Sequence, residues 1–162
     1  MPAALPVHQL ALRTGETLRT HGLMLATAES CTGGMVCAAL TDIAGSSDWF
    51  ERGFVTYSNQ AKNDMLGVPL ALIERHGAVS EPVARAMAEG ALHHSRAQVS
   101  LAITGIAGPG GGTPEKPVGT VWFAWSDVRH TRAEMVIFQG DREQVRTQAT
   151  AHALRGVLSL LG

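Results

Sequence analysis

The sequence has no excess of charge of one sign and few aromatic residues. Its 13 basic and 14 acidic residues give a formal net charge of -1, and neither sign forms a long run. Nucleic-acid-binding proteins usually carry a basic face or arm, because contacts with phosphates dominate their affinity. The charge balance therefore argues against a nucleic-acid partner. Aromatic residues make up only 5% of the chain, so we expect a core built mainly from aliphatic side chains and Met.

Long apolar runs and cysteines are also scarce. No segment approaches 18 uninterrupted apolar residues, so no membrane span is predicted. The N-terminal stretch MPAALPVHQL lacks a basic region followed by an apolar core, which argues against a secretory signal. The two cysteines, Cys31 and Cys37, are too few for a disulfide framework and suit a reducing compartment. We therefore expect a cytoplasmic protein.

The chain has the size and the periodicity of one α/β domain covering residues 1–162. Short apolar runs that predict strands alternate with segments of helical spacing, and two late runs are close enough to pair as a hairpin. This order predicts a three-layer α/β/α sandwich with a mixed, mostly parallel central sheet. The predicted strands are 23–28, 54–57, 99–104, 118–125 and 133–138, and the predicted helices are 5–21, 35–43, 59–67, 69–76, 81–92 and 141–160.

The segment AESCTGG, Ala28 to Gly34, follows the first predicted strand and precedes a helix. Ligands of parallel sheets bind beyond the carboxyl ends of the strands. A nucleophile such as Ser30 is exposed at such a turn, and the helix start offers N–H groups to a developing oxyanion. Gly33 and Gly34 would let a substrate approach the backbone. The alternative is structural, with Ser30 or Thr32 only capping the helix.

A second segment, YSNQAK, places Tyr57 at a predicted strand end and Lys62 on the following helix, for which Asn59 is the expected N-cap. A lysine deprotonates a serine only when it is itself neutral, so burial must lower its pKa. The Tyr57 hydroxyl would then orient or relay the proton. The alternative is an exposed Lys62 on a surface helix, with Tyr57 in the core.

The glycine-rich loop from Gly105 to Pro117 also follows a predicted strand. It matches neither the Walker A pattern nor GxGxxG. A backbone nest for a phosphate or an aromatic ring and a plain ordered turn are both compatible with its composition.

Cys31 is a second candidate nucleophile, because a helix N-terminus is expected to lower the pKa of its thiol. A cysteine hydrolase normally needs a histidine base, and none of the seven histidines stands in a signature context. HExxH is also absent, so metal chemistry has no support. Cys31 is therefore expected to pack beside the catalytic residue.

Together these segments resemble the CinA C-terminal domain family. The resemblance runs from Ala26 to the last helix, through AESCTGG, FVTYSNQAK, HGAVSE, TGIAGPGGGTPEKPVGTVW and GDR. Within the family the chain resembles the stand-alone nicotinamide-nucleotide amidases, which convert nicotinamide mononucleotide to nicotinate mononucleotide and ammonia in pyridine-nucleotide salvage. The resemblance implies Ser30 as nucleophile, Lys62 as general base and Tyr57 as a partner in proton transfer. In this scheme main-chain N–H groups near Gly33 and Gly34 hold the oxyanion.

The resemblance also implies how the substrate is held. Thr104 and Gly105 line the pocket in this interpretation, and Arg142 in the GDR segment meets the phosphate through its planar fork of donors. Arg146, one helical turn further on, binds the phosphate together with Arg142 or in its place. No metal or organic cofactor is implied, and a homo-oligomer is expected.

Three other functions stay open at this point. The chain could be a non-catalytic nucleotide-binding module linked to competence or DNA damage, although binding alone requires none of Ser30, Tyr57 and Lys62. A hydrolase that uses Cys31 is the second. The third, a nucleotide phosphohydrolase, lacks the carboxylate cluster that holds its metals.

Overall fold

The computed structural model describes residues 5–162, so residues 1–4 of the stretch searched for a secretory signal lie outside the described residues. Within this range no helix is long and apolar enough to cross a membrane. The elements in chain order are α1 (Val7–His21), β1 (Leu25–Glu29), α2 (Met35–Thr41), a 3-10 turn η1 (Ser46–Asp48), β2 (Phe50–Val55), α3 (Asn59–Leu66), α4 (Leu70–His76), α5 (Glu81–His93), β3 (Val99–Gly105), β4 (Thr120–Asp127), β5 (Thr131–Ile137) and α6 (Arg142–Leu161).

The five strands form one sheet in the order β2-β1-β3-β4-β5. β1 pairs in parallel with β2 on one side and with β3 on the other. β4 runs antiparallel to both β3 and β5, so it alone points against the other strands. The predicted mixed, mostly parallel sheet and its late hairpin are confirmed.

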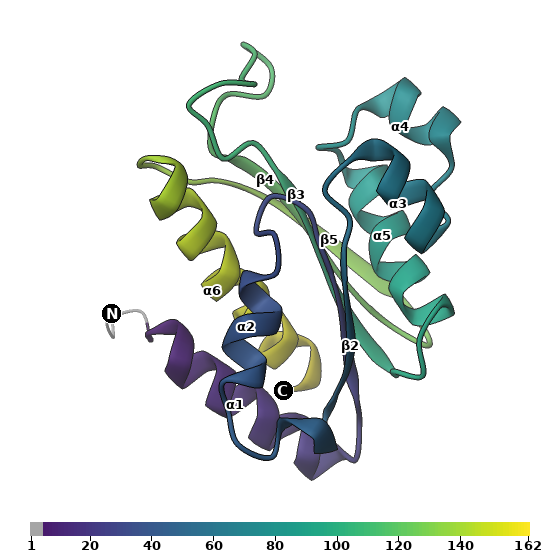
Figure 1. Ribbon diagram of the computed structural model, residues 1–162, viewed down its shortest axis with the longest axis vertical. Helices are drawn as coiled ribbons and strands as arrows, with labels where there is room; N and C mark the ends of the chain where they lie inside the picture. Colours follow the sequence, from purple (N-terminus) through teal and green to yellow (C-terminus); the bar gives the residue numbers. More distant parts are fainter. Residues whose placement is uncertain (1–4) are drawn as a thin grey trace.

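Helices cover both faces of the sheet, with α1, α2 and α6 on one face and α3, α4 and α5 on the other (Figure 1). Because successive strand residues point to opposite faces, β3 contributes Leu101 and Ile103 to one core and Ala102 to the other. The first core also holds the fully buried Trp125, whose indole N–H donates to Ala153 O at 2.9 Å. The predicted three-layer sandwich is confirmed.

Two local predictions around β2 are wrong. The second strand is Phe50–Val55, so it begins earlier than predicted and ends before Tyr57. Its charged and glycine residues resemble a loop in sequence, but they suit an edge strand that pairs with β1 on one side only. The N-cap of α3 is Ser58, whose hydroxyl accepts a hydrogen bond from the Ala61 N–H at 3.0 Å, and Asn59 is the first helical residue.

Candidate active site

Ser30 lies directly beyond the carboxyl end of β1, where the chain turns toward α2. Its N–H donates to Ile103 O on β3 at 3.0 Å, so the sheet still anchors the first residue of the turn. The turn continues through Gly33 and Gly34, whose φ angles of 58° and 107° fall in the left-handed region that favours glycine. These two glycines are thus required by the backbone of the turn, and α2 begins only at Met35.

The Glu29 carboxylate holds this turn in place through hydrogen bonds. It is fully buried, and its Oε1 accepts from the Thr32 hydroxyl at 2.7 Å and from the N–H groups of Gly34 and Val36 at 3.2 and 3.0 Å. Its Oε2 accepts from the Cys37 N–H at 3.1 Å. The carboxylate therefore occupies the donors at the start of α2, where a negative charge is favoured. Sequence reasoning missed this residue, although an acidic side chain shortly before a predicted helix was the available signal.

Lys62 reaches Ser30 from α3, which covers the face of the sheet opposite to α2 (Figure 1). Its ammonium nitrogen lies 2.9 Å from Ser30 Oγ, and the side chain is 1% exposed. Burial lowers the pKa of Lys62 from 10.5 to about 8, because the desolvated ammonium form is disfavoured. The predicted neutral lysine is thus accessible near physiological pH.

Two main-chain carbonyls determine where the lone pair of a neutral Lys62 points. Thr56 O lies 3.0 Å from Nζ and Tyr57 O lies 3.2 Å from it. A neutral amine has two N–H bonds and one lone pair, and these two carbonyls accept both N–H bonds. The lone pair is then left for the third neighbour, the Ser30 hydroxyl. This arrangement can remove the serine proton.

Tyr57 contacts the Ser–Lys pair through its main chain, and its side chain extends elsewhere. The side chain is 62% exposed, and its hydroxyl accepts from Arg142 Nη2 at 3.2 Å. The other branch of the Arg142 guanidinium donates to Gly108 O at 2.8 Å. Arg142 therefore links the start of α6 to the Tyr57 segment and to the glycine-rich loop.

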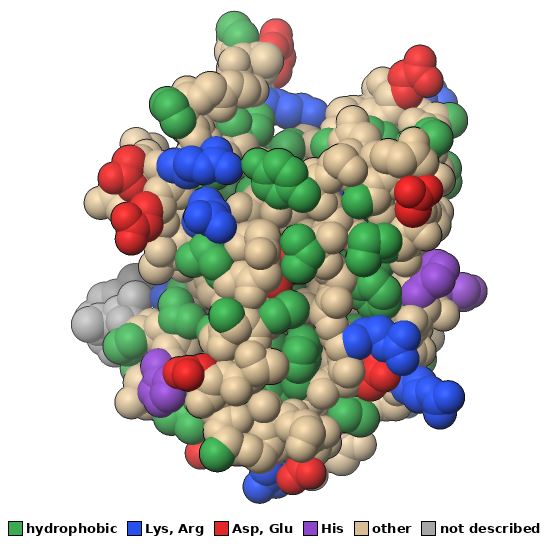
Figure 2. Space-filling view, in the orientation of Figure 1, with side chains coloured by type: hydrophobic (Ala, Val, Ile, Leu, Met, Phe, Trp, Pro, Cys, Tyr) green, Lys and Arg blue, Asp and Glu red, His purple; other side chains and the backbone are tan. Residues whose placement is uncertain are grey.

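These groups line one pocket of about 300 Å³. It opens at the end of the molecule where the space-filling view shows a notch between the 105–117 loop and α4 (Figure 2). Six of the nine residues predicted for the site lie in its wall: Ser30, Tyr57, Lys62, Thr104, Gly105 and Arg142. The other lining residues are Cys31, Asn59, Ala78, Val79, Ile106, Ala107, Gly108, Gly110 and Gly111.

The structure does not bring Gly33, Gly34 and Arg146 into the pocket wall. The Gly33 N–H donates to Ser30 O at 3.0 Å, and the Gly34 N–H donates to the Glu29 carboxylate at 3.2 Å. The donors that we expected to hold an oxyanion are therefore occupied by protein acceptors. Arg146 contacts the back of the turn instead, through main-chain carbonyls.

The expectation that a helix N-terminus lowers the pKa of Cys31 is wrong. The residue is 5% exposed and precedes α2 by several positions, and burial raises the pKa of its thiol to about 11. No histidine lines the pocket. Across residues 5–162 no group of three or more His, Cys, Asp or Glu side chains is arranged to hold a metal ion. The thiol therefore has neither a low pKa nor a histidine base in the pocket.

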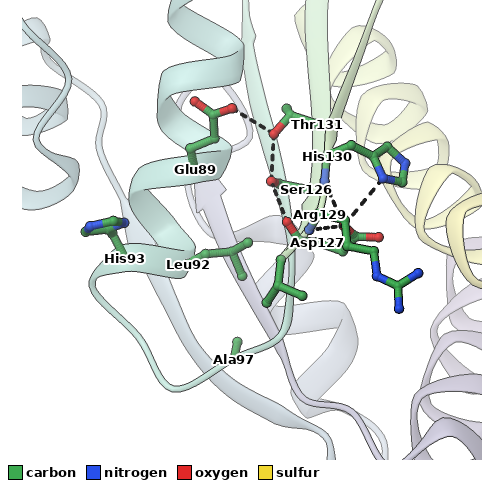
Figure 3. Close-up of a pocket in the computed structure, with 10 residues that line it drawn as sticks. Glu89, Leu92, His93, Ala97, Ser126, Asp127, Arg129, His130 and Thr131 are labelled. Atoms are coloured by element: carbon green, nitrogen blue, oxygen red, sulfur yellow. Dashed lines mark hydrogen bonds and ion pairs between the residues drawn. The ribbon is translucent and has the colours of Figure 1, made fainter.

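A second hollow, of about 450 Å³, lies between the end of α5 and the β4–β5 turn (Figure 3). Its polar groups pair with one another: the Thr131 hydroxyl donates to Glu89 at 2.8 Å and lies 2.7 Å from Ser126 Oγ. This hollow is at the amino ends of the parallel strands, away from the end where α/β sheets bind their ligands. Its geometry supports no chemistry comparable to that around Ser30.

Fold and site together define an α/β protein of the three-layer sandwich class, with a serine and a buried lysine paired at the carboxyl end of a parallel strand. The model of the CinA C-terminal domain matches residues 7–161. The chain belongs to this family.

Its relatives include both short and long proteins. The chain is 57% identical over 150 residues to the nicotinamide-nucleotide amidohydrolase PncC of Escherichia coli K12, covering 91% of this chain and 90% of that protein. It is 55% identical over 142 residues to a CinA-like protein of Akkermansia muciniphila, covering 87% of this chain but 34% of that protein. The crystal structure of a competence/damage inducible protein, CihA, from Agrobacterium tumefaciens superposes with a TM-score of 0.94 at 44% identity, covering 100% of both chains.

Proposed function

We propose that this chain is an amidohydrolase that converts nicotinamide mononucleotide to nicotinate mononucleotide and ammonia. The observation that carries the proposal is the buried Lys62 Nζ, 2.9 Å from Ser30 Oγ in an open pocket. The relative from Escherichia coli named as a nicotinamide-nucleotide amidohydrolase supports the substrate, because its match covers 91% of this chain. The Ser–Lys pair supports a serine nucleophile that needs no histidine.

In the first step neutral Lys62 removes the hydroxyl proton of Ser30, and Ser30 Oγ attacks the carboxamide carbon. The two electrons of the carbonyl π bond move to its oxygen, and main-chain N–H groups of the turn after Ser30 hold this oxyanion. The ammonium form of Lys62 then gives its proton to the amide nitrogen. The C–N bond breaks, ammonia leaves, and the acyl group stays on Ser30.

Water completes the reaction in a second, similar step. Lys62 is neutral again after it has protonated the leaving amide nitrogen, so it takes a proton from a water molecule that attacks the acyl carbon. The ester bond to Ser30 breaks and the serine recovers its proton from Lys62. Each protonation state that the cycle needs is available close to neutral pH, because burial holds the pKa of Lys62 at about 8.

The substrate would lie between Arg142 and the Ser–Lys pair. Arg142 carries the charge that suits the 5′-phosphate, with Thr104 and Gly105 in the wall beside the scissile amide. The Thr104 hydroxyl donates to Ala78 O at 2.9 Å, which keeps this wall rigid. A neutral Lys62 also avoids repulsion of the positively charged pyridinium ring. The exposed Tyr57 ring would form the opposite wall.

A nucleotide-binding module without turnover is the second candidate. It would use the pocket and Arg142 equally well. Burying an ammonium group costs free energy, however, and a pure binding site gains nothing from a lysine held against a serine. The Lys62 environment therefore favours catalysis.

The proposal is tested by incubating the purified protein with nicotinamide mononucleotide in the presence of a chelator and separating the products. We expect nicotinate mononucleotide and ammonia in equal amounts. Release of free nicotinamide would mean cleavage of the glycosidic bond, and a bound but unchanged mononucleotide would favour the binding module. Either result would overturn the amidase.

A further inference from the structure

Arg146 lies on α6 one turn after Arg142, yet its guanidinium contacts the nucleophile turn and not the pocket. Its Nε donates to Cys31 O at 2.9 Å, and its Nη2 lies 3.4 Å from Thr32 O. A Cβ added at Gly33 would meet Arg146 Nη2 at 3.5 Å, so the guanidinium packs directly on this turn. The contact joins segments more than a hundred residues apart.

The carbonyls of the turn determine the direction of its free N–H groups. In a trans peptide the C=O and the N–H of the same unit point in opposite directions. The Cys31 carbonyl is held by Arg146, which directs the Thr32 N–H away from α6. The Ser30 carbonyl is held by the Gly33 N–H, which fixes the Cys31 N–H in the same way. Within residues 5–162 neither the Cys31 nor the Thr32 N–H donates a hydrogen bond to a protein acceptor.

Two free donors directly after a nucleophile form the geometry of an oxyanion site. The Gly33 and Gly34 N–H groups are occupied, and of the two free donors only the Cys31 N–H belongs to a residue that lines the pocket. We propose that Arg146 is a positioning residue: by holding the Cys31 carbonyl it fixes the main chain of Cys31, which lines the pocket and whose N–H binds the oxyanion. This inference rests on the proposed amidase function.

The role differs from phosphate binding in the kinetic constant that it changes. Oxyanion contacts form only in the transition state, so their loss lowers kcat and leaves substrate binding unchanged. Removing one oxyanion donor from a serine hydrolase costs about 100- to 1000-fold in kcat. Misplacing the Cys31 N–H is expected to have an effect at the lower end of this range, so Arg146→Ala should reduce kcat about 100-fold with KM changed less than about twofold.

The experiment compares wild type, Arg146→Ala and Arg146→Lys, with Arg155→Ala as a matched control on the same helix. Ammonia release gives kcat and KM for nicotinamide mononucleotide. Calorimetry on Ser30→Ala with and without Arg146→Ala gives the Kd of the intact substrate. We expect an unchanged Kd, a kcat restored in part by Arg146→Lys or by added guanidinium ion, and normal kcat in Arg155→Ala. Arg146→Lys keeps one donor for Cys31 O, so it carries the test if Arg146→Ala does not fold.

Two results would overturn the inference alone: an Arg146→Ala enzyme with normal kcat, or a Kd weakened tenfold or more, which would make Arg146 a phosphate ligand. A wild-type protein that releases no ammonia would overturn the amidase and this inference with it. The first two results require an active wild type, so the two failures are distinguishable.

Discussion

In the proposed mechanism, the protonation state of Lys62 makes the rate of the amidase depend steeply on pH. With burial holding the pKa of Lys62 at about 8, only its neutral form accepts the Ser30 proton. The neutral fraction is then about 1% at pH 6, about 10% at pH 7 and about 50% at pH 8. We therefore expect kcat/KM to rise about tenfold per pH unit up to pH 7.5 and to level off above pH 9.

The assay is ammonia release at subsaturating nicotinamide mononucleotide between pH 6 and 10, with Lys62→Arg as the variant that keeps a cation but cannot deprotonate. Lys62→Arg should be inactive throughout this range. A wild-type rate that is constant from pH 6 to 9 would refute a lysine base. A rate still rising steeply between pH 9 and 10 would point to the Cys31 thiol, whose pKa burial raises to about 11.

The same pKa makes a prediction for stability. The folded pKa of about 8 lies below the unfolded value of 10.5, so the unfolded chain binds more protons between these values. Stability therefore rises as the pH increases from 8 to 10.5, and at pH 7 the buried ammonium costs about 3 kcal/mol. Lys62→Met removes this cost but also the donors of Thr56 O and Tyr57 O, at about 1 kcal/mol each. At pH 7 we expect an inactive variant that is more stable by about 1 kcal/mol, and whose advantage is lost by pH 10 in urea denaturation.

Three further substitutions, with a fourth as a control, test the binding, turn and packing assignments. Arg142→Ala should raise KM for the mononucleotide about 10- to 100-fold with little change in kcat, as the loss of a charged hydrogen bond predicts; an unchanged KM would exclude Arg142 from phosphate binding. Glu29→Ala leaves the Thr32 hydroxyl and three main-chain N–H groups without their acceptor, so the free energy of unfolding should fall by about 3–5 kcal/mol; wild-type stability in urea would contradict this role. Gly156→Ala would place a Cβ 1.9 Å from the Trp125 ring and should cost about 1–3 kcal/mol, whereas Gly110→Ala meets no atom within 4 Å and should leave the melting temperature unchanged.

Sequence periodicity predicted the layers and the existence of all five strands, because short apolar runs and helical spacing are local signals. It misplaced β2, where Glu51, Arg52 and Gly53 give an edge strand the composition of a loop. The Ser30–Lys62 contact spans segments 32 residues apart, and no local pattern predicts such a contact. It was inferred from the family resemblance, and the structure places the two side chains together in one pocket.

The surroundings of Ser30 were not predictable for the same physical reason. Arg146 and Cys31 are 115 residues apart in sequence, and no local pattern predicts their contact. The spacing of Arg146 from Arg142 on the helix indicated only that the two arginines could bind the same ligand. The hydroxyl of Tyr57 faces Arg142, which only the packed structure reveals. The expected homo-oligomer stays a prediction, to be checked by size-exclusion chromatography with light scattering.

The most direct measurement is ammonia release from nicotinamide mononucleotide by wild type, Ser30→Ala and Cys31→Ala, with chelator present and folding verified by thermal melting. Intact-mass spectrometry during turnover would detect a nicotinoyl nucleotide on the protein. We predict activity and the acyl adduct in wild type and Cys31→Ala, and neither in a folded Ser30→Ala. An active Ser30→Ala, or an adduct that disappears only with Cys31→Ala, would contradict the serine amidase.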